Sequence, residues 1–294
     1  MGVFAALGTA LCWAIAARLF RGTGNAFSPL TMNFWKGLIS IAILAVVLVF
    51  VQPTGLTTHT ILWLLLSGLI GIGIGDTCFF KALQSIGDSQ AVLVAETLAP
   101  LFTALFAMAF IGEWITWQQW VGVAVVLLSV DMVIKARKRS TTHVFATSGY
   151  LYGVGAALCQ AVGAVVSRDI LSSGEVDAAS AAFLRLIGGM FFVVPFIAFT
   201  KTKYMPTITN GKRIWPAFFV ATLLGTTAAI YLQMFAFAYA KAAVVQTLIA
   251  TSALMSLGVA WAFGEKATKA TVAWSAIALV GVAILVSFGA PTTH

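Results

Sequence analysis

Among the ionisable side chains inside stretches of sequence that are otherwise almost entirely apolar, four are the candidates for chemistry. Lys36 and Arg185 are the cations, and Asp76 and Glu96 are the acids. A charge in an apolar environment is costly, so such residues usually face a cavity or a partner. The cations would bind a carboxylate. The acids would bind an amine or a proton, because burial favours the uncharged form of a carboxyl group.

Aromatic and amide residues complete the predicted substrate-binding set. They are Trp13, Phe79, Gln160, Tyr231 and Gln246. An aromatic wall with a few polar groups suits a small organic molecule, although helix packing would explain any one of these residues by itself. The charges have competing explanations too. Lys36 and Arg185 could extend to the lipid headgroups, and Asp76 could form a structural pair with Lys36 or Lys81.

The composition indicates that lipid surrounds these charges. Of the 294 residues, 61% are hydrophobic and 9% are charged, whereas a soluble domain carries about 25% charged residues. A helix needs about 20 apolar residues to cross the hydrocarbon core. The stretches that meet this length are residues 3–20, 29–51, 60–82, 88–110, 116–135, 148–170, 178–199, 213–238, 242–262 and 270–288. We interpret the first as a retained helix, because it has no basic lead-in and no clear cleavage site. The predicted fold class is an all-α integral membrane protein with ten transmembrane helices.

Several enzyme classes have no motif in this sequence. No spacing of His, Cys and carboxylate residues resembles a metal site, and no P-loop, Rossmann or GxSxG motif occurs in its required context. The three cysteines fall within predicted spans and are expected to be unpaired. We therefore predict no metal, no cofactor and no enzymatic activity. The net charge of +8 is explained by loops beside anionic lipid, so we expect no nucleic-acid partner.

The two halves of the chain share an order of features that indicates an internal repeat. Residues 79–113 align without a gap on residues 231–265, so Phe79 falls on Tyr231. The same alignment places Gly112-Glu113 on Gly264-Glu265, and earlier in each half Lys36 corresponds to Arg185 and Trp13 to Gln160. Each half contains five spans, an odd number, so the halves enter the membrane from opposite sides. Inverted repeats of this kind are characteristic of secondary transporters, whose substrate sites lie near the midplane between the repeats.

The predicted organisation is a first five-helix repeat at residues 1–136, a basic linker at 137–146 and a second five-helix repeat at 147–290. Basic residues gather in the odd-numbered loops, the linker included, which predicts that these loops are cytoplasmic and that both termini are outside. Asp131 precedes Lys135 by one helical turn, so an ion pair within one helix is expected there.

Residues 75–113, GDTCFFKALQSIGDSQAVLVAETLAPLFTALFAMAFIGE, resemble the EamA domain of the drug/metabolite transporter superfamily. The resemblance lies in an aromatic-rich helix ending in an ALxxI turn, an Ala- and Leu-rich helix with a central Pro, and a Gly-Glu corner. The second half is similar from Tyr231 to Val286, with Ser252 in place of the Pro, and residues 10–14, ALCWA, resemble the first helix of the family. In the second half, Gln160 takes the place of the Trp. The resemblance implies two inverted five-helix repeats and the export or exchange of small metabolites, and many relatives are described with both termini inside.

The sequence therefore predicts a secondary active transporter in the cell (inner) membrane, crossing it many times and working by alternating access. Its expected substrates are small organic metabolites, above all amino acids or related zwitterions. Its other expected partners are membrane lipids and protons as a coupling ion, while the oligomeric state is left open. A proton-coupled exporter of cationic or hydrophobic drugs is the nearest alternative. A membrane enzyme acting on lipid-linked substrates and a non-transporting scaffold or sensor are alternatives of other classes.

Overall fold

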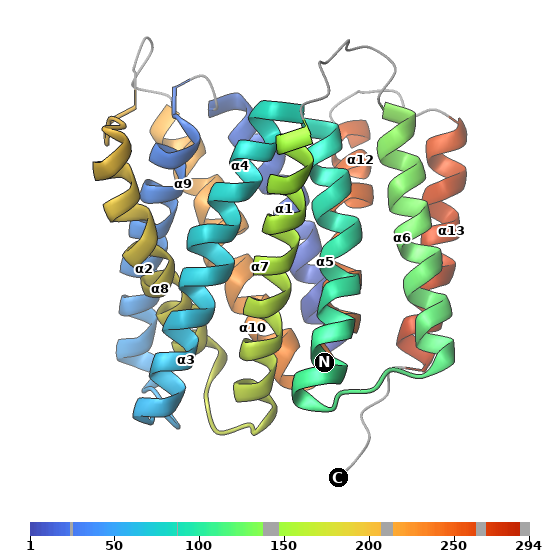
Figure 1. Cartoon of the computed structure of the whole chain (residues 1–294), viewed down its shortest axis with the longest axis horizontal. Coiled ribbons are helices and arrows are strands. Elements are labelled where there is room, and N and C mark those ends of the chain that lie inside the picture. The colour runs from blue at the N-terminus through green and yellow to red at the C-terminus, as the bar shows by residue number, and fades with distance from the viewer. Residues whose placement is uncertain (24–25, 87, 138–146, 207–213, 263–268, 289–294) are drawn as a thin grey trace.

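The computed structural model describes residues 1–23, 26–86, 88–137, 147–206, 214–262 and 269–288, and the helices that they form lie side by side in one bundle (Figure 1). The first half holds α1 (Gly2–Thr23), α2 (Pro29–Val51), α3 (Thr58–Gly68), η1 (Leu69–Ile74), α4 (Gly75–Ile86), α5 (Asp88–Ile111) and α6 (Trp117–Arg137). The second half holds α7 (Thr147–Ser172), α8 (Ala178–Thr200), α9 (Ile214–Thr222), η3 (Leu223–Ala228), α10 (Ala229–Tyr239), α11 (Ala242–Ala250), α12 (Ser252–Ala262) and α13 (Lys269–Ser287).

Within the described residues these helices form ten passes, each at a predicted span. Eight helical stretches are long and apolar enough to cross a membrane, and the shorter apolar stretches Ala242–Ser256 and Val272–Ser287 supply the other two. The predicted all-α, ten-helix fold is therefore confirmed. The predicted linker at 137–146 lies outside the described residues except for Arg137. Cys12, Cys78 and Cys159 are unpaired, as expected.

Three passes depart from the continuous helices that hydropathy predicts. The third and the eighth each contain a six-residue π-helical segment, η1 (LIGIGI) and η3 (LLGTTA). Such segments are rare and often occur at functional sites. The ninth pass is interrupted at Thr251, whose hydroxyl donates a hydrogen bond to the Leu248 carbonyl at 2.6 Å. Proline does not cause the interruption, because this pass contains none, whereas Pro100 of the fourth pass lies inside the unbroken helix α5.

The helix starts show how the two repeats correspond. Ser28 caps the N-terminus of α2 by accepting a hydrogen bond from the Thr31 amide, and Asp177 caps α8 in the same way through the Ser180 amide. Lys36 and Arg185 each lie eight residues after their cap, so they occupy equivalent positions in α2 and α8. Because the first half makes an odd number of passes, the second half runs through the bundle in the opposite direction.

The two ends of the bundle differ in the chain segments that lie there. The terminal side is the end where α1 begins and α13 finishes, at the bottom of Figure 1. The linker side is the end where α6 finishes and α7 begins.

Glycines bring the third pass into close contact with α8. A Cβ atom on Gly68 would lie 1.9 Å from the Arg185 carbonyl oxygen, and one on Gly188 would lie 2.0 Å from the Leu65 carbonyl oxygen. Further along the same pass, Gly73 meets Phe192 and Gly75 meets Cys159. Small residues allow helices in a membrane to approach this closely. The cluster of glycines in the third pass therefore packs against the second repeat, and it fixes the backbone that carries Arg185.

Replacing Gly68 by alanine tests this packing. We expect Gly68→Ala to lower the free energy of unfolding by about 1–3 kcal/mol, because the added methyl group meets backbone atoms that cannot rotate away. The measurement is the thermal unfolding midpoint in detergent. Gly258→Ala is the matched control, since a Cβ atom there would meet nothing within 4 Å. Equal midpoints for the two variants would contradict the packing described here.

Candidate functional site

A cavity of about 930 Å³ lies between the two repeats. Eight of the nine residues predicted to bind substrate line it: Trp13, Lys36, Asp76, Phe79, Glu96, Gln160, Arg185 and Gln246. They come from α1, α2, α4, α5, α7, α8 and α11, so helices far apart in the sequence bring them together. Whether they bind a substrate remains a prediction, but their gathering around one cavity is what that prediction requires.

The cavity runs from the inner part of the bundle, where Arg185, Gln233 and Gln246 line it, toward the linker side. It is lined by residues 13–20 in the later part of α1, 33–37 in the earlier part of α2 and 92–96 in the earlier part of α5. These stretches lie toward the linker side, because α1 ends there and α2 and α5 begin there. Toward the terminal side, buried apolar side chains fill the bundle, among them Ala6, Ala107, Leu171, Phe237, Val244 and Val245. The cavity therefore extends toward the linker side, and buried apolar side chains separate it from the terminal side.

Tyr231 is the predicted site residue that the structure places elsewhere. Its side chain is 38% exposed on α10, and it does not line the cavity, whereas Gln233 is buried and does. Phe79 and Gln233 are each the fifth residue of the helix that follows a π-helical segment. The structural counterpart of Phe79 is thus Gln233, and the gapless alignment is two residues out of register here. The error arose because the alignment was anchored at the Gly-Glu corners, while the residues between the π-helical segments and those corners differ in number.

Lys36 and Asp76 face each other across the cavity wall formed by α2 and α4. Their charged atoms, Nζ and Oδ2, are 4.0 Å apart, and the side chains are 17% and 36% exposed. The ammonium group also lies 5.9 Å from the ring centre of Phe20 and 6.0 Å from that of Phe80, within the range of cation–π attraction. These two charges largely compensate each other, which is the structural pairing left open as an alternative for Asp76.

Arg185 is more buried than its repeat counterpart, with an exposed fraction of 5%. Its Nη1 atom donates to the thioether sulfur of Met234 at 3.5 Å, and its Nε atom has no hydrogen-bond partner among the described residues. Asp76 interacts with it electrostatically, but no carboxylate of the described residues lies within ion-pair distance. A thioether is a weak acceptor. The guanidinium group therefore has unused donors beside the cavity.

Glycines provide the space in which this guanidinium lies. A Cβ atom on either Gly71 of η1 or Gly163 of α7 would approach Nη2 of Arg185 to 3.1 Å. Together with Gly68 under the backbone of Arg185, these positions form a slot of small residues from both repeats. A side chain held in this way is positioned before any ligand arrives, which lowers the entropic cost of binding.

Glu96 is the second charge of the cavity without a close partner. It lies on α5, it is half-buried, and it forms no hydrogen bond or ion pair with any described residue. No cation of the described residues lies within ion-pair distance of its carboxylate, as Lys36 does of Asp76. Among the described residues that line the cavity, Arg185 and Glu96 are consequently the charged side chains without an ion-pair partner.

Further polar residues line the cavity that were not predicted as site residues. Asn33 is 3% exposed, and its side-chain nitrogen has no hydrogen-bond partner among the described residues. The same holds for Gln246, a predicted site residue, which is 2% exposed. Asn33 lies three residues before Lys36, hence on the same face of α2, and this spacing could have identified it. Thr226 and Gln233 also line the cavity. Thr226 lies in the π-helical segment η3 and Gln233 lies in the helix that follows it, and hydropathy does not reveal this segment.

Trp13 connects the first helix to that segment. Its indole nitrogen donates a hydrogen bond to the Gly225 carbonyl at 3.0 Å. Gly225 is the third residue of η3, as Gly71 is of η1, and both line the cavity. The two π-helical segments therefore face the same space from opposite repeats. With acids, cations, amides and aromatic rings on its walls, this cavity can bind a small molecule that carries charge.

Solved and curated proteins resemble this chain along most of its length. A crystal structure superposes with a TM-score of 0.80 over 98% of this chain and 97% of that chain at 20% identity, which shows a shared fold. An uncharacterized transporter of Bacillus subtilis, YyaM, is 23% identical over 72% of this chain and 69% of its own length. An uncharacterized transporter of Archaeoglobus fulgidus is 24% identical over 63% of this chain, which spans 64% of that relative.

The family comparison agrees with the geometry of the two repeats. The model of the EamA-like transporter family matches residues 1–134 and again residues 147–287, so each half of the chain carries one copy. The resemblance inferred from the Gly-Glu corner and the aromatic helix is confirmed. The chain belongs to the EamA-like transporter family, and it is a multi-pass membrane transporter.

Proposed function

We propose that this transporter moves small zwitterionic metabolites, such as amino acids, by alternating access around the cavity between its repeats. The observation that carries this proposal is the pair of uncompensated charges of opposite sign, Arg185 and Glu96, on the walls of one cavity. Arg185 would bind the carboxylate of the substrate, and Glu96 would bind its ammonium group. The cavity volume of about 930 Å³ is within the range of small-molecule sites, about 300–1,000 Å³.

Charge balance explains why a zwitterion fits better than a simple ion. Lys36 and Asp76 already neutralise each other, so they add little net charge to the site. A substrate with a single charge would satisfy either Arg185 or Glu96 and leave the other uncompensated in a low-dielectric environment, which is costly. A molecule with both charges compensates both residues at once.

The transport step proposed is rocking of one repeat against the other, which is the usual behaviour of inverted repeats. The structure would represent the state whose cavity is reached from the linker side. Since the basic loops lie on that side, the positive-inside rule makes it the cytoplasmic side. In this scheme the substrate enters from the cytoplasm and leaves on the terminal side, as an exporter requires, and the protein resides in the cell (inner) membrane.

Glu96 is also the proposed site of proton coupling. A carboxyl group without a cation partner can release its proton when an amine arrives and take up another when the amine leaves. The substrate and the proton would then compete for one group, which gives exchange of one for the other.

Counterflow in proteoliposomes tests the substrate class. Liposomes preloaded with one unlabelled compound are offered the labelled compound at equal pH on both sides, with amino acids, nucleobases and organic cations tested in turn. We expect uptake of amino acids above the level of protein-free liposomes. Uptake of organic cations alone would replace the proposed substrate by a cationic drug, bound at the two acids.

Replacing Arg185 separates binding from folding. We expect Arg185→Gln to reduce amino-acid counterflow roughly 10- to 100-fold, since a hydrogen bond to a charged group is lost. The thermal unfolding midpoint should stay the same or rise, because an uncompensated buried charge is removed. A large fall in the midpoint would instead give Arg185 a structural role. Arg185→Lys keeps the charge and should retain part of the counterflow.

A double-mutant cycle tests whether Lys36 and Asp76 act mainly on each other. Their partial exposure predicts a coupling free energy of about 0.2–1 kcal/mol between Lys36→Gln and Asp76→Asn, measured from unfolding midpoints. The double variant removes no net charge, so it should retain more counterflow than Arg185→Gln. A loss as large as that of Arg185→Gln would place the pair among the substrate-binding residues.

Glu96→Gln tests the coupling. The amide cannot exchange a proton, so we expect accumulation driven by a pH gradient to fall to the level measured at equal pH. Asp76→Asn serves as the comparison and should keep most of its gradient-driven accumulation. Normal accumulation by both variants at every gradient would show that these acids do not couple transport to protons.

A further inference from the structure

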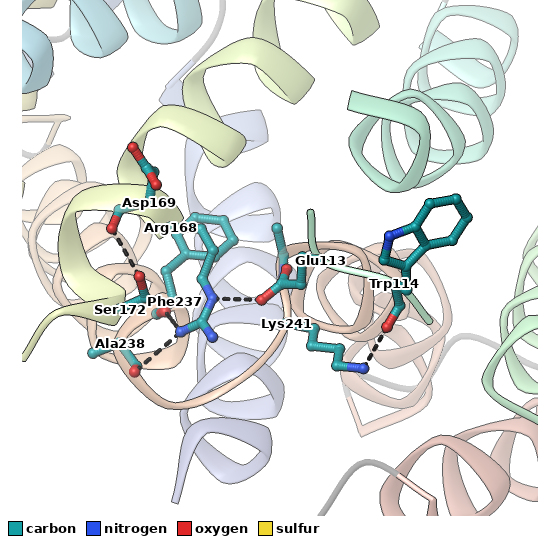
Figure 2. A network of polar contacts seen from close by, with 9 residues as sticks. Glu113, Trp114, Arg168, Asp169, Ser172, Phe237, Ala238 and Lys241 are labelled. Carbon is teal, nitrogen blue, oxygen red and sulfur yellow. Dashed lines mark hydrogen bonds and ion pairs between the residues drawn. The ribbon is translucent and has the colours of Figure 1, made fainter. Parts of the chain in front are cut away.

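A network of polar contacts joins the two repeats at the terminal side, away from the cavity. Glu113 lies between α5 and α6 in the first repeat, and Arg168 lies near the end of α7 in the second. Arg168 Nε and Glu113 Oε1 are 2.8 Å apart, with side chains 16% and 11% exposed. Figure 2 shows these two side chains at the centre of the network. Neither residue was predicted as functional, although the repeated Gly-Glu corner pointed to Glu113.

The same two side chains bind the ends of two further helices. Arg168 Nη1 donates to the carbonyl oxygens of Phe237 at 2.6 Å and Ala238 at 3.1 Å, close to the end of α10 (Figure 2). Glu113 Oε2 accepts a hydrogen bond from the Ala242 amide at 2.7 Å, the first residue of α11. A cation at the end of a helix and an anion at the start of one both complement the helix dipole.

The first repeat thus supplies the cap that α11 does not find in its own repeat. The residue before α11, Lys241, makes no side-chain capping bond. Its ammonium group instead donates to the Trp114 carbonyl in the first repeat (Figure 2). Glu113 and Trp114 together make three contacts to the second repeat, through Arg168, Lys241 and Ala242. Separating the repeats at this end would break all three.

We propose that the Glu113–Arg168 network is a latch that holds the terminal side closed while the cavity is reached from the linker side. The proposal rests on the alternating access inferred above. Substrate can leave on the terminal side only if the repeats separate there, and the network joins them at that end. Polar groups suit a reversible closure, because water can replace each of their contacts when the repeats separate.

A second ion pair, Asp131–Lys135, differs from Glu113–Arg168 because it does not connect the two repeats. Asp131 and Lys135 are 2.7 Å apart on a single helix, α6, as predicted from their spacing. That pair joins no separate elements, so its loss should not change the balance between two arrangements of the repeats. It is therefore a matched control for the latch.

Cysteine accessibility tests the latch without any substrate. In protein whose native cysteines are replaced by alanine, two reporters are introduced separately. Ala17→Cys lies on the cavity wall. Ala243→Cys lies on α11, directly after the residue whose amide Glu113 binds, where the native alanine is 1% exposed. A membrane-impermeant thiol reagent is applied to right-side-out and inside-out vesicles, and the rate of labelling is measured from each side.

We expect the Ala17→Cys reporter to react from the linker side and the Ala243→Cys reporter to be protected. Glu113→Gln should raise the rate at Ala243→Cys from the terminal side by up to about fivefold, the shift that loss of one such pair allows, and lower the rate at Ala17→Cys. Arg168→Lys should act in the same direction. Asp131→Asn should change neither rate.

The proposal is overturned if folded Glu113→Gln and Arg168→Lys proteins, checked by size-exclusion chromatography, label both reporters at the wild-type rates. If one of them does not fold, Glu113→Asp, which retracts the carboxylate but keeps its charge, takes its place with the same expected shift. Shifted labelling without any counterflow would support the latch and contradict the proposed substrate. Unshifted labelling with normal counterflow would remove the latch and leave the proposed transport standing.

Discussion

An uncompensated guanidinium group inside a membrane-spanning bundle is the constraint to which the rest of this structure is fitted. Arg185 is almost fully buried and binds one thioether, so the fold must hold it beside a cavity rather than against lipid. Gly68 lies under its backbone, and Gly71 and Gly163 leave room for its guanidinium. A larger residue at Gly71 or Gly163 would therefore displace the guanidinium, whereas one at Gly68 would displace the backbone of α8.

The two π-helical segments extend this arrangement across the interface between the repeats. η1 contributes Gly71 to the wall around Arg185, and η3 contributes Gly225, whose carbonyl accepts the indole hydrogen bond of Trp13. Each π-helical turn changes which side chains of the following helix face the cavity. The repeats share this device but carry different residues, a carboxylate with aromatic rings in the first and Gln233 in the second. An inverted pair of folds thus encloses an asymmetric site, as binding a molecule with two different ends requires.

The two ends of the bundle differ in how they are closed. Toward the linker side the walls of the cavity carry the half-buried charges of Lys36, Asp76 and Glu96. On the terminal side apolar side chains fill the bundle, and the Glu113–Arg168 network joins the repeats at that end. The site and the proposed latch are therefore separate groups of residues, so that substitutions in one can be tested without altering the other.

Hydropathy and charge by themselves determined the ten passes, the inverted order of the repeats and the four charges of the cavity. They did so because lipid excludes charged side chains, and backbone polar groups, that have no partner within the protein. Only the tertiary structure decided which charges compensate each other: Lys36 is paired with Asp76, whereas Arg185 and Glu96 are not, although Lys36 and Arg185 are counterparts in sequence. It also decided that Gln233 rather than Tyr231 faces the cavity, since the register after a π-helical turn depends on backbone geometry. The contact of Glu113 with Arg168 joins segments 55 residues apart, and no local pattern encodes such a contact, because it depends on how the two repeats pack against each other.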